Sequence, residues 1–205
     1  MASCTSLLSN EVIHTTYYSL DRVYSKALTK PALNNNDNLP ILIVNTPIAA
    51  PGFDTQRMMY TRAPYQLEYF AKNEWIDTPA KMLRPLMIST IEKTSAFNTV
   101  LAKQSVTASD IRLESELIKL VQNFNTTPSH VEFILRVSMI DSATNKVIAL
   151  QEFNERVDAK SDNPMGGVIA ANAAINLALN KLGNFSSQVV SFWLSQSKLK
   201  KNNAE

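Results

Sequence analysis

Few residues of this 205-residue chain could take part in catalysis or hold a metal ion. The chain contains one cysteine, Cys4, and two histidines, His14 and His130. A structural zinc ion needs three or four nitrogen, sulfur or carboxylate ligands close together, and no His-x-x-x-His or Cys-x-x-Cys spacing provides them. We therefore expect no metal and no cofactor. A hydrolase would require His14 or His130 to meet a nucleophile in the folded chain.

The four glycines limit the phosphate-binding and nucleophile motifs that the chain can contain. They are Gly52, Gly166, Gly167 and Gly183, and they match neither G-x-x-x-x-G-K-[ST], nor G-x-G-x-x-G, nor G-x-S-x-G. Gly166 and Gly167 could present backbone amides to an anion, or they could make the entrance of a helix flexible. The near absence of catalytic and phosphate-binding motifs favours a non-enzymatic binding or assembly protein.

Charged residues indicate no acid–base pair and no strong electrostatic field. The formal net charge is +2, which does not favour a nucleic-acid partner. Glu114 and Glu116 lie two apart on a predicted strand, so they share one face, as expected of a solvated surface. The segment RMMYTRAPY combines Arg57 and Arg62 with tyrosines, and a protein contact or cross-strand pairing is an alternative to nucleic-acid binding there. We expect no nucleic-acid partner.

Apolar periodicity predicts a chain that is rich in strands. One segment is ambiguous: residues 110–124 form either a helix or a long strand with a bulge near Leu117, where the apolar parity changes. The other predicted strands are bounded by turn residues, and residues 56–71 form a hairpin around Pro64. These strands cover residues 14–20, 41–47, 56–71, 96–102, 131–140 and 147–157.

Two helices complete the predicted fold. Thr78 is placed to cap the first helix, with Pro79 at its first position, and Pro85 should kink the helix or end its first turn. Asn163 can cap a second, amphipathic helix of about 30 residues, which Gly183 could interrupt. The element order predicts an α+β fold: a two-layer sandwich with a mostly antiparallel sheet and both helices on one face. The sequence contains no run of about 18 apolar residues, so it predicts no membrane-spanning helix.

From YYSLD onward, the order of motifs resembles a known family. ILIVNTP is a buried strand ending in proline, and RMMYTR is a strand ending in Arg62. The return strand PYQLEYF leads to Trp75 and a helix with Pro79, followed by an F-x-x-V strand, a D-x-x-L strand and an Ala-rich helix. This order, over about residues 17–193, is similar to that of the ABC-type transport auxiliary lipoproteins, which include the Pqi-type lipoproteins of Gram-negative bacteria.

The resemblance implies both a fold and a place in the cell. It implies a fold similar to the N-terminal domain of the TolB translocation protein, in the periplasm, at the inner leaflet of the outer membrane. The implied partners are an MCE-domain protein and an ABC transporter, which together move lipids or other hydrophobic compounds between the two membranes. A homo-oligomer is a further expectation. The alternative function is a carrier that binds a hydrophobic ligand in a pocket between sheet and helices.

The resemblance also implies a role for Cys4. Family members resemble other lipoproteins in carrying a lipobox, and Ala2-Ser3-Cys4 fits its end, although Met1 stands where leucine is usual. We expect an export signal ahead of this sequence in the gene product and acyl chains on Cys4. Thr5, in place of aspartate, favours the outer membrane. At about 0.8 kcal/mol per buried CH₂, several acyl chains make the attachment permanent on cellular timescales.

The chain is accordingly expected to have three parts: a lipoprotein tether over 1–13, the auxiliary lipoprotein α+β domain over 14–196, and a polar C-terminal tail over 197–205. Aromatic and methionine side chains crowd the predicted hairpin of that domain. Strand alternation turns only half of them inward, so the remainder could contact a partner. The candidate partner-interface residues are Met59, Tyr60, Arg62, Tyr65, Tyr69 and Trp75.

Overall fold

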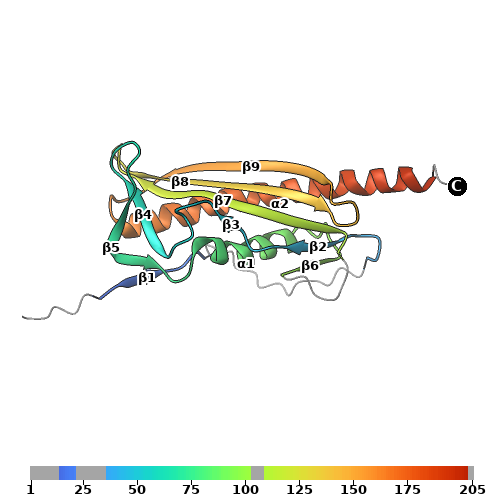
Figure 1. The fold of residues 1–205 in the computed structure, drawn as a ribbon, viewed down its shortest axis with the longest axis horizontal. Coiled ribbons are helices and arrows are strands. Elements are labelled where there is room, and N and C mark those ends of the chain that lie inside the picture. Colours follow the sequence, from blue (N-terminus) through green and yellow to red (C-terminus); the bar gives the residue numbers. More distant parts are fainter. Residues whose placement is uncertain (1–13, 22–35, 103–108, 203–205) are drawn as a thin grey trace, which may run out of the picture.

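The computed structural model describes residues 14–21, 36–102 and 109–202. Cys4 and the expected tether lie outside the described residues. Within them the chain forms a nine-stranded sheet and two helices (Figure 1). The elements are β1 (Thr16–Tyr18), β2 (Ile41–Val44), β3 (Ile48–Ala49), β4 (Arg57–Thr61), β5 (Glu68–Trp75), α1 (Pro79–Glu92), β6 (Thr99–Leu101), β7 (Ile111–Asn123), β8 (His130–Asp141), β9 (Val147–Asp158) and α2 (Pro164–Asn202).

The three long strands β7, β8 and β9 form an antiparallel meander. Buried residues largely alternate along β7 and β8, because successive side chains of a strand point to opposite faces. In β7 the register to β8 shifts between Leu117 and Lys119, so one extra residue moves the apolar side chains back to the inner face. The strand interpretation of residues 110–124, with its bulge, is therefore confirmed.

The short strands join the sheet differently. The predicted hairpin is confirmed, since β4 and β5 pair antiparallel. Parallel pairing connects β4, β2 and β3 to β7, β6 to β2, and β1 to β5. The sheet is thus antiparallel within the three long strands and within the hairpin, and parallel where short strands pair with β7, β2 and β5.

Helix α1 begins where the sequence predicts, but Pro85 does not end it. Thr78 occupies the N-cap position with Pro79 after it, while its side chain makes no capping hydrogen bond. Instead, the Asp77 carboxylate accepts a hydrogen bond from the Thr78 backbone N–H at 2.7 Å. The helix continues through Pro85 to Glu92.

Helix α2 is longer than expected, at 39 residues. Its start is capped as predicted, because Asn163 Oδ1 accepts a hydrogen bond from the Gly166 N–H at 2.8 Å. Gly183 does not interrupt it. A Cβ atom at Gly183 would lie 3.3 Å from the Thr94 methyl group beyond the end of α1, so the glycine allows the two helices to approach closely. The helix continues to Asn202, inside the segment expected to be a polar tail.

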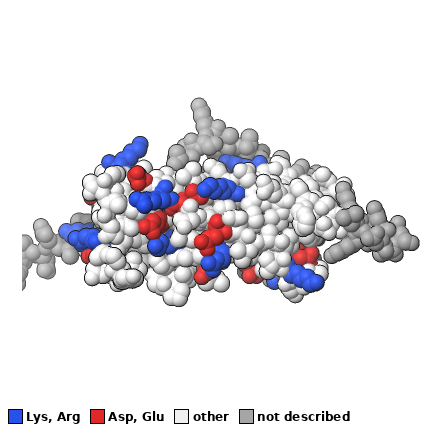
Figure 2. Space-filling model, turned by 90° about the horizontal axis from the view of Figure 1, so that it is seen from above, with Lys and Arg blue, Asp and Glu red and all other residues white. Residues whose placement is uncertain are grey.

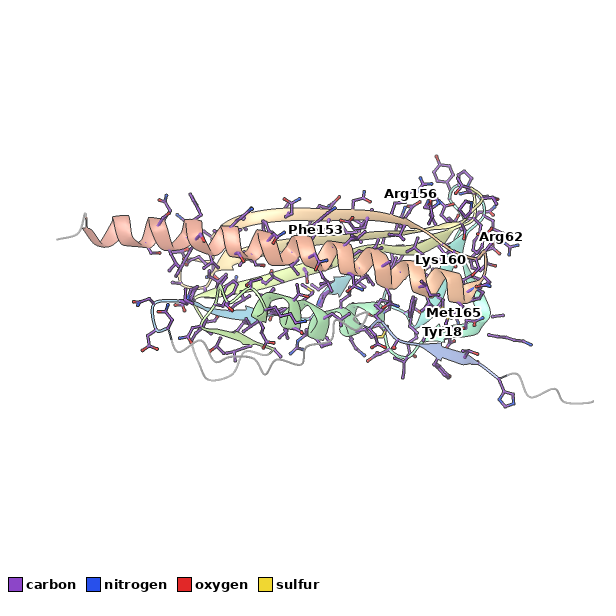
Figure 3. All side chains as sticks on the ribbon, turned by 180° about the vertical axis from the view of Figure 1, so that it is seen from behind. Tyr18, Arg62, Phe153, Arg156, Lys160 and Met165 are labelled. Carbon is purple, nitrogen blue, oxygen red and sulfur yellow. The ribbon has the colours of Figure 1, made fainter. Side chains whose placement is uncertain are left out.

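The core lies between the sheet and the two helices, which cover the same face (Figures 1 and 3). The α+β fold class is confirmed. Neither helix, over the residues described, has the length and apolar character that crossing a membrane requires. The largest fully buried side chains come from the sheet and from both helices; they include Phe133, Leu113, Leu117, Leu135, Leu83, Met87, Ile91, Ile175 and Leu179.

Candidate functional site: the β4–β5 hairpin

The hairpin between β4 and β5 carries an aromatic side chain in an unfavourable backbone conformation. Its turn is closed by a hydrogen bond from the Gln66 N–H to the Ala63 carbonyl at 3.3 Å. The ring of Pro64 fixes its own φ at the first central position of the turn. Tyr65 occupies the second central position, with φ of 65°. The Tyr65 side chain is fully exposed, at 106% relative accessibility. A left-handed non-glycine residue costs on the order of 1–2 kcal/mol, and no buried contact of the ring offsets that cost.

Below the turn, Arg62 is held by two side chains of the hairpin. Its guanidinium group donates to Tyr60 Oη at 2.7 Å and to Glu68 Oε2 at 3.0 Å. Tyr60 Oη in turn donates to the same carboxylate at 2.9 Å. The bond to Tyr60, followed by the bond and charge of Glu68, raises the pKa of Arg62. The charge of Arg62 is therefore largely balanced within the hairpin.

Two ring contacts hold the hairpin to the rest of the sheet. The Tyr60 and Phe70 rings, 4.6 Å apart within the hairpin, lie 5.7 Å and 6.3 Å from the ring of Phe124, which directly follows β7. Tyr69 stands apart from this group, with the Arg57 guanidinium 4.5 Å from its ring centroid. Such cation–π contacts at exposed sites contribute about 0.5–1 kcal/mol. The aromatic side chains of the hairpin thus divide between a packed base and an exposed end.

The structure divides the predicted interface residues in the same way. Arg62, Tyr65 and Tyr69 are exposed and Tyr60 is half-buried. Met59 and Trp75 are core residues, 9% and 4% exposed, so their assignment to a surface is corrected. The bulge between Arg57 and Met59 leaves both Met58 and Met59 buried, which simple alternation does not predict.

Sequence reasoning missed one exposed apolar residue of this hairpin. Leu67 precedes β5 and its side chain is 49% exposed. Its place in the PYQLEYF segment was visible in the sequence, but its orientation depends on where the strand begins. We use the name hairpin tip for Pro64, Tyr65 and Leu67.

The interior between the hairpin strands and the start of helix α2 is closely packed. The space lined by Met58, Trp75 and Gln122 has a volume of about 10 Å³, enough for roughly one water molecule. A Cβ atom at Gly167 would overlap the Gln122 carboxamide, and one at Gly166 would overlap the Ser161 carbonyl. These two glycines therefore allow close packing. Their N–H groups already donate to Asn163, so they form no anion cradle.

One histidine does meet a hydroxyl group, as the hydrolase alternative required. His130 Nδ1 lies 3.0 Å from Thr126 Oγ1, and His130 Nε2 lies 3.2 Å from Glu132 Oε1. The His130 side chain is only 3% exposed, and Thr126 Oγ1 also contacts the Pro128 carbonyl at 3.0 Å. A buried imidazole and a hydroxyl group that already has a hydrogen-bond partner are typical of a structural hydrogen-bond network. His14 is exposed.

Glu132 is the centre of that network. Its carboxylate accepts hydrogen bonds from Lys119 Nζ and Asn123 Nδ2, each at 2.8 Å. Burial raises the pKa of Glu132, but the bonds from Lys119, Asn123 and His130 and the Lys119 charge outweigh it and lower the pKa to about 2. The carboxylate is thus held ionised and is a poor proton donor or acceptor at neutral pH.

Charges on the outer side of β7, β8 and β9 are paired with each other. Glu114 lies 3.1 Å from Arg112, and Arg136 lies 3.3 Å from Glu116 and 2.9 Å from Glu152. Figure 2, which views the molecule from the β9 side, shows acidic and basic side chains interleaved. Exposed pairs of this kind stabilise by about 0–1 kcal/mol each. The solvated-face interpretation of Glu114 and Glu116 is confirmed. Across the described parts of the chain, no group of three or more His, Cys, Asp or Glu side chains could hold a metal ion.

Comparison with known proteins identifies relatives of the fold and of the chain. Protein XCC0632 from Xanthomonas campestris aligns with a TM-score of 0.72 over 89% of this chain and 99% of its own, at 16% identity. A second crystal structure, of an uncharacterized protein, aligns with a TM-score of 0.66 over 85% and 99%, at 13% identity. At these identities the likeness shows the fold alone.

The sequence itself matches a family over most of its length. A search of the curated proteins finds no match. Residues 18–182 match the family described as the ABC-type transport auxiliary lipoprotein component. That family is one of envelope lipoproteins associated with transporters, and the match agrees with the resemblance seen from YYSLD onward. The chain belongs to the ABC-type transport auxiliary lipoprotein family.

Proposed function

We propose that the chain is a non-enzymatic periplasmic lipoprotein of an MCE/ABC-type system that moves lipids or hydrophobic compounds between the inner and outer membranes. In this proposal acyl chains on Cys4 anchor it to the inner leaflet of the outer membrane. The observation that carries the proposal is the family match over residues 18–182. The MCE-domain protein and the ABC transporter of the same system are its proposed partners.

Two features of the structure support a role in assembly. The one imidazole that meets a hydroxyl group is buried in a bonded network with Glu132, which leaves a substrate little access to His130. The buried space between the hairpin strands and the start of α2 is about 10 Å³, far below the roughly 300–1,000 Å³ of ligand pockets. The larger hollows beside α2, of about 670 and 490 Å³, are lined mostly by polar and charged side chains. The small buried space and the polar lining of the larger hollows argue against the carrier alternative, in which a hydrophobic ligand would occupy that interface.

Co-purification from native membranes tests the proposal. The chain carries a C-terminal tag and is extracted with mild detergent, and its partners are identified by mass spectrometry. We expect an MCE-domain protein and an ABC transporter subunit to be recovered with it. A Cys4→Ser variant is the control, and we expect it to leave the membrane fraction. Recovery of the wild-type chain from the cytosol, without transporter components, would contradict the proposal.

A further inference from the structure

We propose that the hairpin tip, formed by Pro64, Tyr65 and Leu67, rests on the lipid surface of the membrane that holds Cys4. This inference relies on the anchor in the proposed function and adds to it an orientation of the body relative to the membrane. Three features of the described residues support it: the direction of β1, the length of chain between Cys4 and β1, and the chemistry of the tip.

The direction of β1 places the incoming chain at the end of the molecule that carries the tip. β1 pairs in parallel with β5, with Thr16 opposite Asn73 and Tyr18 opposite Trp75. Because β5 leaves the hairpin tip and β1 runs the same way, the chain enters β1 from the tip's side. Figure 1 shows β1 and the hairpin at the same end of the molecule, and Figure 3 places Tyr18 and Arg62 at that end.

The tether is long enough to bring Cys4 level with the tip. Asn73 follows Tyr65 by about eight residues, which is roughly 26 Å along a strand at 3.3 Å per residue. About twelve residues separate Cys4 from Thr16, and they span at most roughly 40 Å. A membrane that holds the acylated cysteine can therefore touch the tip without any change in the sheet.

The chemistry of the tip suits the boundary between headgroups and acyl chains. The exposed groups are a tyrosine ring, a leucine side chain and a proline that has no N–H to satisfy. Tyrosine is enriched at membrane interfaces, where its apolar ring and its hydroxyl group are both accommodated. The Arg62 charge is balanced by Glu68 at 3.0 Å, so contact with lipid need not desolvate a lone cation.

The size of the tip favours lipid over protein. A stable protein interface buries about 800 Å² on each partner, from roughly 20–30 residues. The tip exposes only a few side chains, and the residues directly below it are engaged with each other. Tyr65 is also kept in a left-handed conformation with its ring in solvent. An exposed outlier of this kind indicates a functional contact.

Depth-dependent quenching tests the inference. Cys4 is the one cysteine, so maleimide-headgroup lipid in phosphatidylethanolamine–phosphatidylglycerol vesicles couples the full chain at that residue alone. Tyr65→Trp and Leu67→Trp place a probe at the tip. Phe192→Trp is the matched control, because Phe192 is 58% exposed and lies about 40 Å along α2 from Met165, at 1.5 Å per residue. Wild-type protein, whose two tryptophans are Trp75 and Trp193, gives the reference emission.

We expect brominated acyl chains to quench both tip probes at least about twofold more than they quench wild-type emission, because indole rings at the membrane interface lie next to the acyl chains. Phe192→Trp should match wild type. Tip probes that remain open to aqueous acrylamide and unquenched by brominated lipid, or a stronger effect on Phe192→Trp, would overturn the inference. The synthetic linkage replaces the native anchor, so the two proposals fail separately. Unquenched tip probes would refute the orientation without deciding whether Cys4 is acylated in cells. Absence of acylation in cells would refute the anchor without changing the quenching result.

Discussion

Gly166 lies where the first turn of α2 meets the backbone that precedes it. A Cβ atom there would overlap the Ser161 carbonyl, and backbone cannot move aside as a flexible side chain can. We expect Gly166→Ala to lower the free energy of unfolding by about 2–3 kcal/mol, measured by urea denaturation. Gly183→Ala in the same helix is the control. Its change should stay within about 1 kcal/mol, because helix propensity offsets the tighter contact with Thr94.

Glu132 should make stability depend on acid pH. Its pKa is lowered from 4.5 to about 2 in the fold. The ionised carboxylate therefore contributes stability that is complete above about pH 4.5 and is lost as the pH falls through about 2. We expect Glu132→Gln to be less stable than wild type at neutral pH. The difference between the two unfolding free energies should shrink between about pH 4.5 and pH 2; a constant difference would contradict this account.

For single residues, the sequence predicted the chemistry of the hairpin surface better than the burial of each side chain. The crowding of aromatic residues in the hairpin correctly indicated a surface with aromatic side chains, and Tyr65 and Tyr69 are exposed. It also placed Met59 and Trp75 on that surface, whereas both are buried. The network around His130 could not be predicted, because it depends on the register of β7 against β8 and on the turn that brings Thr126 to His130.

The two ends of β5 have different roles, which substitutions can separate. Trp75 ends the strand inside the core, and Trp75→Ala should cost about 3–5 kcal/mol through the lost contacts and the cavity. Tyr65 lies before the strand, and Tyr65→Asn should change the free energy of unfolding by no more than about 0.5 kcal/mol, or raise it, because Asn adopts positive φ more readily. Thermal unfolding of both variants measures this. Similar losses in both would show that Tyr65 supports the fold.

Among elements, local pattern predicted existence and boundaries more than pairing. The bulge in β7 followed from the change of apolar parity at Leu117, and the cap of α2 followed from Asn163 with Pro164. The parallel pairing of β1 with β5 and of β2 with β7 brings together segments far apart in the chain. No local residue pattern encodes those neighbours. Gly183 suggested an interruption, but contact with α1 requires a small residue there.

At the scale of the whole molecule, close packing predicts that the body carries no lipid of its own. The buried space between the sheet and the start of α2 admits roughly one water molecule, and the larger hollows beside α2 are lined mostly by polar and charged side chains. We expect the Cys4→Ser chain to show no saturable binding of a fluorescent fatty acid or lysophospholipid, titrated by fluorescence. Saturable binding of one ligand per chain would instead support the carrier function and would require the helices to move apart from the sheet.

The central claim is that this body is held at a membrane by its lipidated cysteine and acts through contacts with its neighbours. Intact-mass spectrometry of the protein purified from its native membranes tests that claim most directly. The account predicts a mature chain that begins at Cys4 and carries the added mass of a diacylglycerol and one amide-linked acyl chain. A chain that retains residues ahead of Cys4, with a free thiol at that position, would contradict it.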